Sequence, residues 1–553
     1  MFVVVFFCFL KARERIKSPH CGFFCKNMNI IDLIIFFVFT GGIVLFGASF
    51  YSRKATADDF TSAGRSLPGW VVGMSIFSTY VSSISYLGYP GKAYDSNWNA
   101  FVFSLSIPVA SWVAARWFVP FYRKQTSVSA YSFLEERFGL WARWYASACY
   151  LLTQIARIGT IVYLLALPMN LLLGWDIRMV IVLTSIAIIA YSMLGGVKGV
   201  IWADAIQGFI MIGGALVCLC ILLFSHPGGP VESMRMAWEA DKFSLGSFSL
   251  TTLGESTFWV CLVYGIFTNL QNYGIDQNYV QRYHAAKSDH EARFSALFGG
   301  YLFIPVSAVF FLIGTALWSY YHATPELASQ LLNTSTSQPL KGDEVFPFFI
   351  VHVLPTGLTG LLVASIFAAG MSTVSTSITS GATVVMSDFY KRLSLHRPTP
   401  QPLPCREGSE MPNRAENQEE SQAERVSTPL PTREGQGGGS GRSGLFVLRL
   451  SSLVIGVLGI LIALALVNVD SILDSWWKLS SIFSGGMLGL FLLGFLSHKA
   501  RNIDAAIGVV CGFLVIAWIS LGNSGIHEYL AIVFGTITIF LVGFLLTKWL
   551  HRG

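Results

Sequence analysis

The sequence predicts an all-α integral membrane protein with about thirteen transmembrane helices. Two observations support this class. Of the 553 residues, 53% are hydrophobic and only 12% are charged, whereas roughly a quarter of the residues in soluble domains are charged. The apolar residues also gather in runs of about 18 or more, each long enough to cross the hydrocarbon layer as a helix. Because lipid cannot satisfy backbone N–H and C=O groups, such runs indicate helices.

Short polar loops separate the predicted spans. The spans lie near residues 30–51, 69–92, 100–122, 142–173, 179–194, 200–224, 256–280, 296–321, 356–387, 445–468, 472–497, 503–521 and 527–549. One alternate set of loops is rich in Lys and Arg, and it includes Arg53, Arg123, Arg282 and Lys391. Cytoplasmic loops carry such an excess. We therefore expect a plasma or inner membrane protein whose N-terminus lies outside and whose C-terminus lies in the cytoplasm.

Two segments do not fit the pattern of spans. Residues 1–27 carry five Lys and Arg residues on the predicted outer side, which indicates either a translation start at Met28 or a peripheral leader. Residues 394–443 are rich in Pro, Gly, Ser and Glu, a composition that cannot bury enough apolar surface to fold. We expect a disordered cytoplasmic loop there, between spans one to nine (residues 28–393) and spans ten to thirteen (residues 444–553).

The second predicted span is rich in hydroxyl groups at its centre. Ser and Thr side chains fill much of the stretch 78–85, and Gly88, Pro90 and Gly91 follow. A helix interrupted here would free backbone carbonyls to bind a cation. The alternative is a continuous helix whose Ser and Thr hydroxyls bond to its own carbonyls.

The ninth predicted span carries a second group of hydroxyls. Ser372, Ser375 and Thr376 share one helical face by their i, i+3, i+4 spacing, and Thr373 borders that face. Oxygen ligands without carboxylates suit a monovalent cation, because Ca²⁺ and Mg²⁺ favour acidic ligands. The alternative is a face of small residues for helix packing.

Two charged residues fall inside predicted spans. Arg157 lies too deep to reach the membrane surface easily, so it requires an anionic partner, either a protein carboxylate or a bound substrate. Asp204 lies near the cytoplasmic end of its span. It is an interfacial acid, a salt-bridge partner of Arg157, or part of a site. The sequence shows no cluster of His, Asp and Glu residues at membrane depth, which argues against an enzyme, and nothing in it indicates a nucleic-acid partner.

Several motifs resemble those of the sodium/solute symporter family. They are SAGRSLPGWVVGMSIFST in span two, YSMLGGVKGVIWADAIQG across spans five and six, GIDQNYVQR at the end of span seven, and FAAGMSTVSTSITS followed by SDFYKRL in span nine. The resemblance covers nearly the whole chain from Met28, except the 394–443 segment. It implies the inverted five-plus-five repeat of the leucine-transporter-like fold, with spans two to six and seven to eleven as the repeats.

The resemblance also implies two sodium sites. The first falls on the carbonyls of Ser78, Val81 and Ala369 and on the hydroxyls of Ser372 and Thr373. Many family members have Ala at position 78, but only the backbone oxygen is used there. The second site, present in some members, falls on Asp204, Ser372, Ser375 and Thr376. Sodium is the coupling ion, and no other cofactor is expected.

The substrate is implied by similarity to the branch that contains sialic acid, iodide, vitamin and monocarboxylate carriers. The binding positions of the bacterial sialic acid symporters fall on Tyr80, Ser82, Ser85, Arg157 and Asn269. A guanidinium offers a carboxylate two parallel charge-assisted hydrogen bonds. Ser104 departs from the pattern, since that branch has an amide there. We therefore expect sodium-coupled symport of a small organic acid such as sialic acid. The alternatives are a sodium-coupled sugar symporter and a membrane sensor that has lost transport.

Overall fold

The computed structural model describes residues 30–52, 56–125, 127–173, 175–328, 340, 342–395, 440–468, 480, 485–522 and 524–550. The predicted leader, most of the predicted 394–443 loop and half of the predicted span 472–497 lie outside these residues. Every regular element in the described part is helical, and β pairing there is limited to one isolated bridge between Leu67 and Ala286.

The first half of the chain forms fifteen helical elements in the order of the sequence. These are α2 (Ile30–Ser49), α3 (Ala57–Ser62), η1 (Ala63–Arg65), α4 (Gly69–Tyr80), α5 (Ser83–Asp95), η2 (Trp98–Ala100), α6 (Phe101–Leu105), α7 (Ile107–Val113), η3 (Ala114–Phe118), α8 (Val119–Lys124), α9 (Ser132–Phe138), α10 (Leu140–Leu173), α11 (Ile177–Ser225), α12 (Gly229–Glu239) and α13 (Phe258–Ile275).

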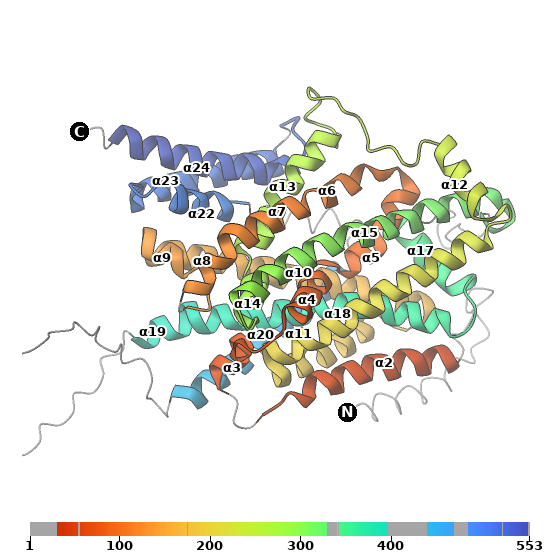
Figure 1. The fold of residues 1–553 in the computed structure, drawn as a ribbon, viewed down its shortest axis with the longest axis horizontal. Helices are drawn as coiled ribbons and strands as arrows, with labels where there is room; N and C mark the ends of the chain where they lie inside the picture. Colours follow the sequence, from red (N-terminus) through yellow and green to blue (C-terminus); the bar gives the residue numbers. More distant parts are fainter. Residues whose placement is uncertain are drawn as a thin grey trace, which may run out of the picture.

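The second half continues the helical fold. Its elements are α14 (Gln277–Ala285), α15 (Asp289–Ala323), α16 (Pro325–Ala328), α17 (Gly342–His352), α18 (Leu358–Val384), η5 (Val385–Tyr390), α19 (Lys391–Leu395), α20 (Ser440–Ala465), η6 (Leu466–Asn468), α22 (Met487–Leu496), α23 (Asn502–Leu521) and α24 (Leu530–Leu550). In Figure 1 the long helices run broadly along the horizontal axis, with α9 and α19 near the left end and α12 and α17 near the right. Residues 440–443, predicted to belong to the disordered loop, lie instead in the first turn of α20.

The described helices agree with a polytopic membrane protein. Nine of them are long and apolar enough to cross a bilayer, and the bent pair α4–α5 makes ten. One of the nine, α11, has 49 residues, or about 74 Å if it were straight, so it is too long for one crossing. It bends at Gly196, where φ is +56° and a Cβ atom would lie 3.0 Å from the Phe60 ring. Its two arms match the predicted spans 179–194 and 200–224.

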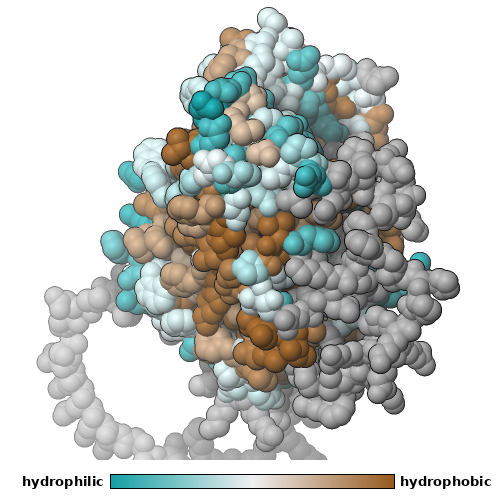
Figure 2. Space-filling model, turned by 90° about the vertical axis from the view of Figure 1, so that its right-hand side faces the viewer, coloured by the Kyte–Doolittle hydropathy of each residue, from teal (hydrophilic) through white to brown (hydrophobic). Residues whose placement is uncertain are grey.

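Figure 2 looks onto the right-hand end of the molecule as drawn in Figure 1. Hydrophilic residues cover much of the upper part of this end face, and a patch of hydrophobic residues lies below them. A face with many polar side chains suits an end of the helix bundle that emerges from the lipid.

The predicted interruption of span two is confirmed. Helices α4 and α5 meet at an angle of 55°, with Val81 and Ser82 extended between them, so the continuous-helix alternative is wrong. The break deprives the carbonyls of residues 78–81 of the i+4 N–H donors that a continuous helix would supply. These carbonyls are therefore free to bind other groups.

A second interruption, in span seven, was not predicted. Helix α13 ends at Ile275 and α14 begins at Gln277, and Asp276 between them is extended. The Asp276 carboxylate caps α14 by accepting a hydrogen bond from the N–H of Asn278 at 2.7 Å. Figure 1 shows α4 to the left of α5 but α14 to the left of α13, so the two broken helices run in opposite directions.

Helix α18 lies in the centre of the bundle and is buried almost throughout. A carboxylate fixes each of its ends. At the beginning, Oδ1 of Asp32 accepts hydrogen bonds from the N–H groups of Gly357 and Gly360 at 2.6 and 2.9 Å. Beyond its other end, the buried Asp388 is bonded by Arg143 at 2.5 Å and Ser147 at 2.6 Å. These contacts fix the register of α18 against α2, which carries Asp32, and against α10, which carries Arg143 and Ser147.

Candidate sodium and substrate site

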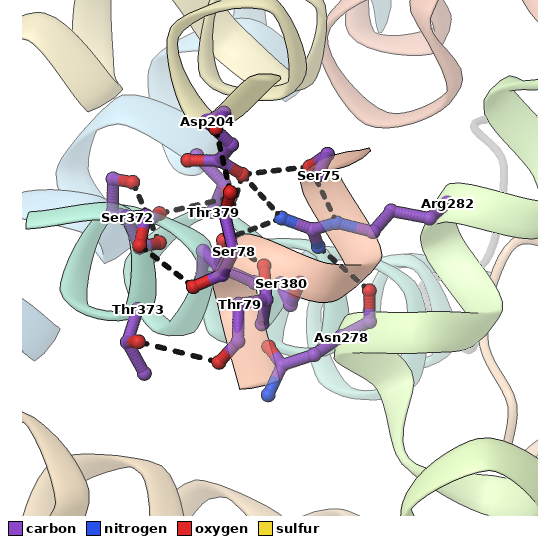
Figure 3. A network of polar contacts seen from close by, with 12 residues as sticks. Ser75, Ser78, Thr79, Asp204, Asn278, Arg282, Ser372, Thr373, Thr379 and Ser380 are labelled. Carbon is purple, nitrogen blue, oxygen red and sulfur yellow. Dashed lines mark hydrogen bonds and ion pairs between the residues drawn. The ribbon is translucent and has the colours of Figure 1, made fainter. Parts of the chain in front are cut away.

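The carbonyls freed by the break in α4 are bonded by hydroxyls of α18 (Figure 3). Ser372 Oγ donates towards the carbonyls of Ser78 and Ala369 at 2.9 and 3.0 Å. Thr373 Oγ1 lies 3.2 Å from the carbonyls of Thr79 and Ala369. All of these atoms are uncharged oxygens, and all five residues are buried. Such a cluster can exchange the hydration shell of a monovalent cation for protein oxygens.

Four of the five residues predicted for the first sodium site meet in this cluster. They are Ser78, Ala369, Ser372 and Thr373. Val81 is buried at the break, but no hydrogen bond within the described residues joins its carbonyl to α18. Thr79 was not predicted, although its carbonyl belongs to the cluster. The sequence signal for it was its position one residue after Ser78 in an interrupted helix.

Asp204 forms a buried ion pair with Arg282. The Arg282 Nη2 lies 2.7 Å from Oδ2 of Asp204 and 2.5 Å from Oγ1 of Thr376. Ser75 Oγ donates to the same carboxylate oxygen at 2.7 Å. Both predicted alternatives for Asp204, an interfacial acid and a partner of Arg157, are therefore wrong.

Arg282 was predicted to be a loop residue and is instead buried. The prediction ended span seven at residue 280, but α14 continues to Ala285 and carries Arg282 into the bundle. Figure 3 shows its guanidinium between Asp204 and Asn278. Counting Arg282 as a cytoplasmic charge was thus the result of placing the end of this helix five residues too early, at 280 instead of 285.

Polar atoms without a partner remain beside this ion pair. Oδ1 of Asp204 and both amide atoms of Gln207 are buried and have no hydrogen-bond partner among the described residues. Gln207 follows Asp204 by three residues on α11, so the two lie on one helix face. Ser375 Oγ donates to the carbonyl of Ser372 at 3.0 Å, and Thr376 Oγ1 lies 3.4 Å from Oδ2 of Asp204, the oxygen that also binds Arg282. A buried carboxylate oxygen without a donor is costly, and a cation bound there would satisfy it.

Replacing Arg282 with methionine is expected to destabilise the protein by about 3–5 kcal/mol, because it leaves Asp204 buried without its cation. Unfolding of the purified protein in detergent measures this loss. The double variant Asp204→Asn with Arg282→Met is expected to recover part of it. Arg235→Met, which removes an exposed arginine paired with Glu232, serves as the control and is expected to unfold like the wild type. Equal stability of Arg282→Met and the wild type would contradict this account.

A cavity of about 220 Å³ lies beside the break in α4. Tyr80, Ser82, Ser85 and Arg157, all predicted substrate residues, line it. Lys92 and Tyr529 also line it, near the ends of helices predicted to be extracellular. Arg157 donates a hydrogen bond to the carbonyl of Thr79 at 3.3 Å. The same carbonyl receives the Thr373 hydroxyl, so one backbone oxygen joins the cavity to the hydroxyl cluster.

Asn269, the fifth predicted substrate residue, does not line the cavity. Asn269 is buried. Its side-chain oxygen Oδ1 accepts a hydrogen bond from the Tyr80 hydroxyl, and its side-chain NH₂ group donates one to Ser106 Oγ at 2.8 Å. It therefore orients Tyr80. Ser104, which departs from the branch pattern, is also buried and bonds to Ser307 at 2.8 Å. Gln154, Gln271, Asn272 and Asp276 line the cavity but were not predicted.

The Sodium:solute symporter family matches residues 60–399, which is more than half of the chain and includes both broken helices and α18. The chain belongs to the sodium:solute symporter family. Membership agrees with the motifs of the sequence and with a bundle of membrane-spanning helices.

Individual relatives of this family member extend the match to nearly the whole chain. A sodium/sialic acid symporter of Aliivibrio fischeri is 30% identical over 523 residues, which cover 94% of this chain and 93% of that one. The human sodium-coupled monocarboxylate transporter 2 is 27% identical over 504 residues, covering 90% and 73%. A solved structure of a substrate-bound, outward-open Na⁺-coupled sialic acid symporter superposes with a TM-score of 0.80 at 29% identity, covering 94% and 98%.

Proposed function

We propose that this protein is a sodium-coupled symporter of an organic acid, with sialic acid as the specific substrate. The observation that carries this proposal is the shared carbonyl of Thr79. It accepts hydrogen bonds from Thr373 in the hydroxyl cluster and from Arg157 in the cavity. A sodium ion that orders the hydroxyl cluster thereby also positions Arg157 in the cavity. The sialic acid symporters among the relatives support this choice of substrate.

The first sodium ion is assigned to the hydroxyl cluster. Its ligands are the carbonyls of Ser78, Val81 and Ala369 and the hydroxyls of Ser372 and Thr373, with the Thr79 carbonyl close by. These hydroxyls must rotate away from their present acceptors so that their lone pairs face the ion. The second ion is assigned to Asp204 Oδ1 with Ser372, Ser375 and Thr376. Arg282 would neutralise the other carboxylate oxygen, Oδ2 of Asp204, whether or not the sodium ion is bound.

The substrate carboxylate is assigned to Arg157. Among the described residues this guanidinium has a single weak acceptor, the Thr79 carbonyl at 3.3 Å, and it can form a two-bonded pair with a carboxylate. Tyr80, Ser82 and Ser85 line the cavity within the same region and supply hydroxyl groups for the rest of the ligand. Asn269 acts through Tyr80, which it holds in place. These roles require no chemical change in the solute, as transport demands.

The mechanism is alternating access between two inverted repeats. Spans two and seven are both broken and run in opposite directions, as two helices related by such a repeat would. We assign thirteen spans, with the N-terminus outside and the C-terminus in the cytoplasm. In this orientation the cavity extends towards the outside through Lys92 and Tyr529. Sodium and substrate bind from outside, and rocking of the repeats then exposes both to the cytoplasm.

The number of sodium ions determines how far the solute can be accumulated. Each ion releases roughly 2.3 kcal/mol in a potential of 100 mV and roughly 1.4 kcal/mol in a tenfold gradient. A monoanion must move against that same potential, so one ion leaves only about 1.4 kcal/mol, or about tenfold accumulation. Accumulation far beyond tenfold therefore requires the second ion at Asp204.

The substrate assignment is tested by competition in proteoliposomes that contain the purified protein. Uptake of radiolabelled sialic acid is driven by an inward sodium gradient, and unlabelled sialic acid, glucose or pyruvate is added outside. We expect sialic acid to compete strongly and glucose not to compete. Strong competition by glucose would identify a sugar symporter instead, and an absence of any uptake with normal ligand-induced stabilisation would indicate a sensor.

A further inference from the structure

The cavity contains a fixed negative charge as well as the fixed positive charge of Arg157. Asp276, at the break between α13 and α14, lines the same cavity. Within the described part of the chain, no carboxylate oxygen lies within 4.0 Å of the Arg157 guanidinium. The two charges thus do not neutralise each other in a direct ion pair. A cavity with separate charges of both signs complements a ligand with an anionic group and a donor group.

The two oxygens of Asp276 have different environments. Oδ1 accepts the hydrogen bond from the N–H of Asn278 at 2.7 Å that caps α14. Oδ2 accepts no hydrogen bond from the described residues and is not among their enclosed atoms without a partner, and Asp276 lines the cavity. The amides of Gln271 and Asn272, which precede Asp276 on α13, also line the cavity. One side of the cavity therefore offers a strong acceptor that the helix cap leaves free.

We infer that Asp276 determines specificity: it selects acids that also carry a hydroxyl or ammonium donor over plain monocarboxylates. The inference rests on the proposed function and deepens it, because it concerns the same cavity. The carboxylate of the solute pairs with Arg157, and a donor on the other part of the solute bonds to Oδ2 of Asp276. A short monocarboxylate has no such donor, so it leaves Oδ2 without a partner and is repelled by its charge.

Asp276→Asn tests this inference without removing the helix cap, since Asn and Asp are equally good N-cap residues. The single amide oxygen would cap Asn278, and the NH₂ group would replace Oδ2, so an acceptor in the cavity becomes a donor. A hydrogen bond to a charged group contributes a factor of roughly 10 to 100 in affinity. We expect at least a tenfold loss of affinity for sialic acid and for gluconate, and an unchanged or higher affinity for pyruvate.

The measurement is equilibrium binding of each acid to purified protein in saturating NaCl, together with the sodium-induced rise in unfolding temperature. Asp176→Asn is the matched control, because Asp176 also caps a helix, by accepting from the N–H of Arg178 at 2.8 Å, and lies outside the cavity lining. It should bind all three acids like the wild type. The stabilisation by sodium should be the same in the wild type and both variants.

The outcomes separate the inference from the proposed function. If Asp276→Asn lowers the affinities for sialic acid and pyruvate equally, or changes neither, the inference is overturned while sialic acid transport by the wild type stands. A loss of sodium-induced stabilisation in Asp276→Asn would show a structural role and would also overturn it. A wild-type protein that binds pyruvate but neither sialic acid nor gluconate would contradict both the inference and the proposed substrate.

Discussion

Arg157→Ala is expected to abolish sodium-driven uptake of sialic acid. Removing one partner of a desolvated, hydrogen-bonded charge pair costs roughly 2–5 kcal/mol, which is a loss of about 30-fold to several thousand-fold in affinity. Within the part of the chain that the structure describes, the substitution removes one hydrogen bond, to the Thr79 carbonyl at 3.3 Å, so the protein should remain folded. Uptake of labelled sialic acid into proteoliposomes, normalised to the amount of inserted protein, measures the effect.

Arg157→Lys serves as the informative companion variant. Lysine keeps the positive charge but lacks the planar fork, so it should retain partial binding. Arg178→Ala, at an exposed position beside the cap of α11, is the matched control and should transport normally. Uptake by Arg157→Ala within twofold of the wild type would show that the solute carboxylate binds elsewhere.

Ser372→Ala and Thr373→Ala are each expected to raise the sodium concentration for half-maximal uptake by about 5- to 100-fold. Each change removes one hydroxyl ligand, and it also leaves the freed carbonyls of α4 with one partner fewer. A lost partner of a buried polar group costs roughly 1–3 kcal/mol. Initial uptake rates over a range of external sodium concentrations, at fixed ionic strength, measure the shift.

Two further variants separate ligand loss from altered packing. Thr373→Ser keeps the hydroxyl and should restore sodium activation to near the wild-type value. Ser365→Ala removes a buried hydroxyl of the same helix whose acceptors are Leu361 and Ile210, away from the break, and should leave sodium activation unchanged. A normal sodium dependence in both Ser372→Ala and Thr373→Ala would remove the basis for the first site.

Much of this molecule could be predicted from local patterns of the sequence. Apolar runs mark membrane helices because lipid penalises unsatisfied backbone groups, and the hydroxyl-rich stretch 78–85 with Gly88, Pro90 and Gly91 marks a helix that breaks. The i, i+3, i+4 spacing of Ser372, Ser375 and Thr376 likewise predicts one face of α18, since spacing along a single helix is a property of the sequence alone.

Contacts between distant segments could not be predicted in this way. Arg282 and Asp204 lie 78 residues apart, and their pairing depends on α14 continuing past its predicted end into the bundle. Asn269 and Tyr80 are likewise brought together only by helix packing. The capping role of Asp276 had a local signal, an N-cap residue in the polar stretch after Gly274, but span seven was predicted as one continuous helix across it, over residues 256–280.

The central claim is that a sodium ion among uncharged oxygens of α4 and α18 controls solute binding and transport. The most direct test is the initial rate of sialic acid uptake into sealed proteoliposomes, with sodium outside or with choline replacing all of it. The account predicts rapid uptake with sodium and none above protein-free vesicles with choline. Equal rates in the two salts would contradict it.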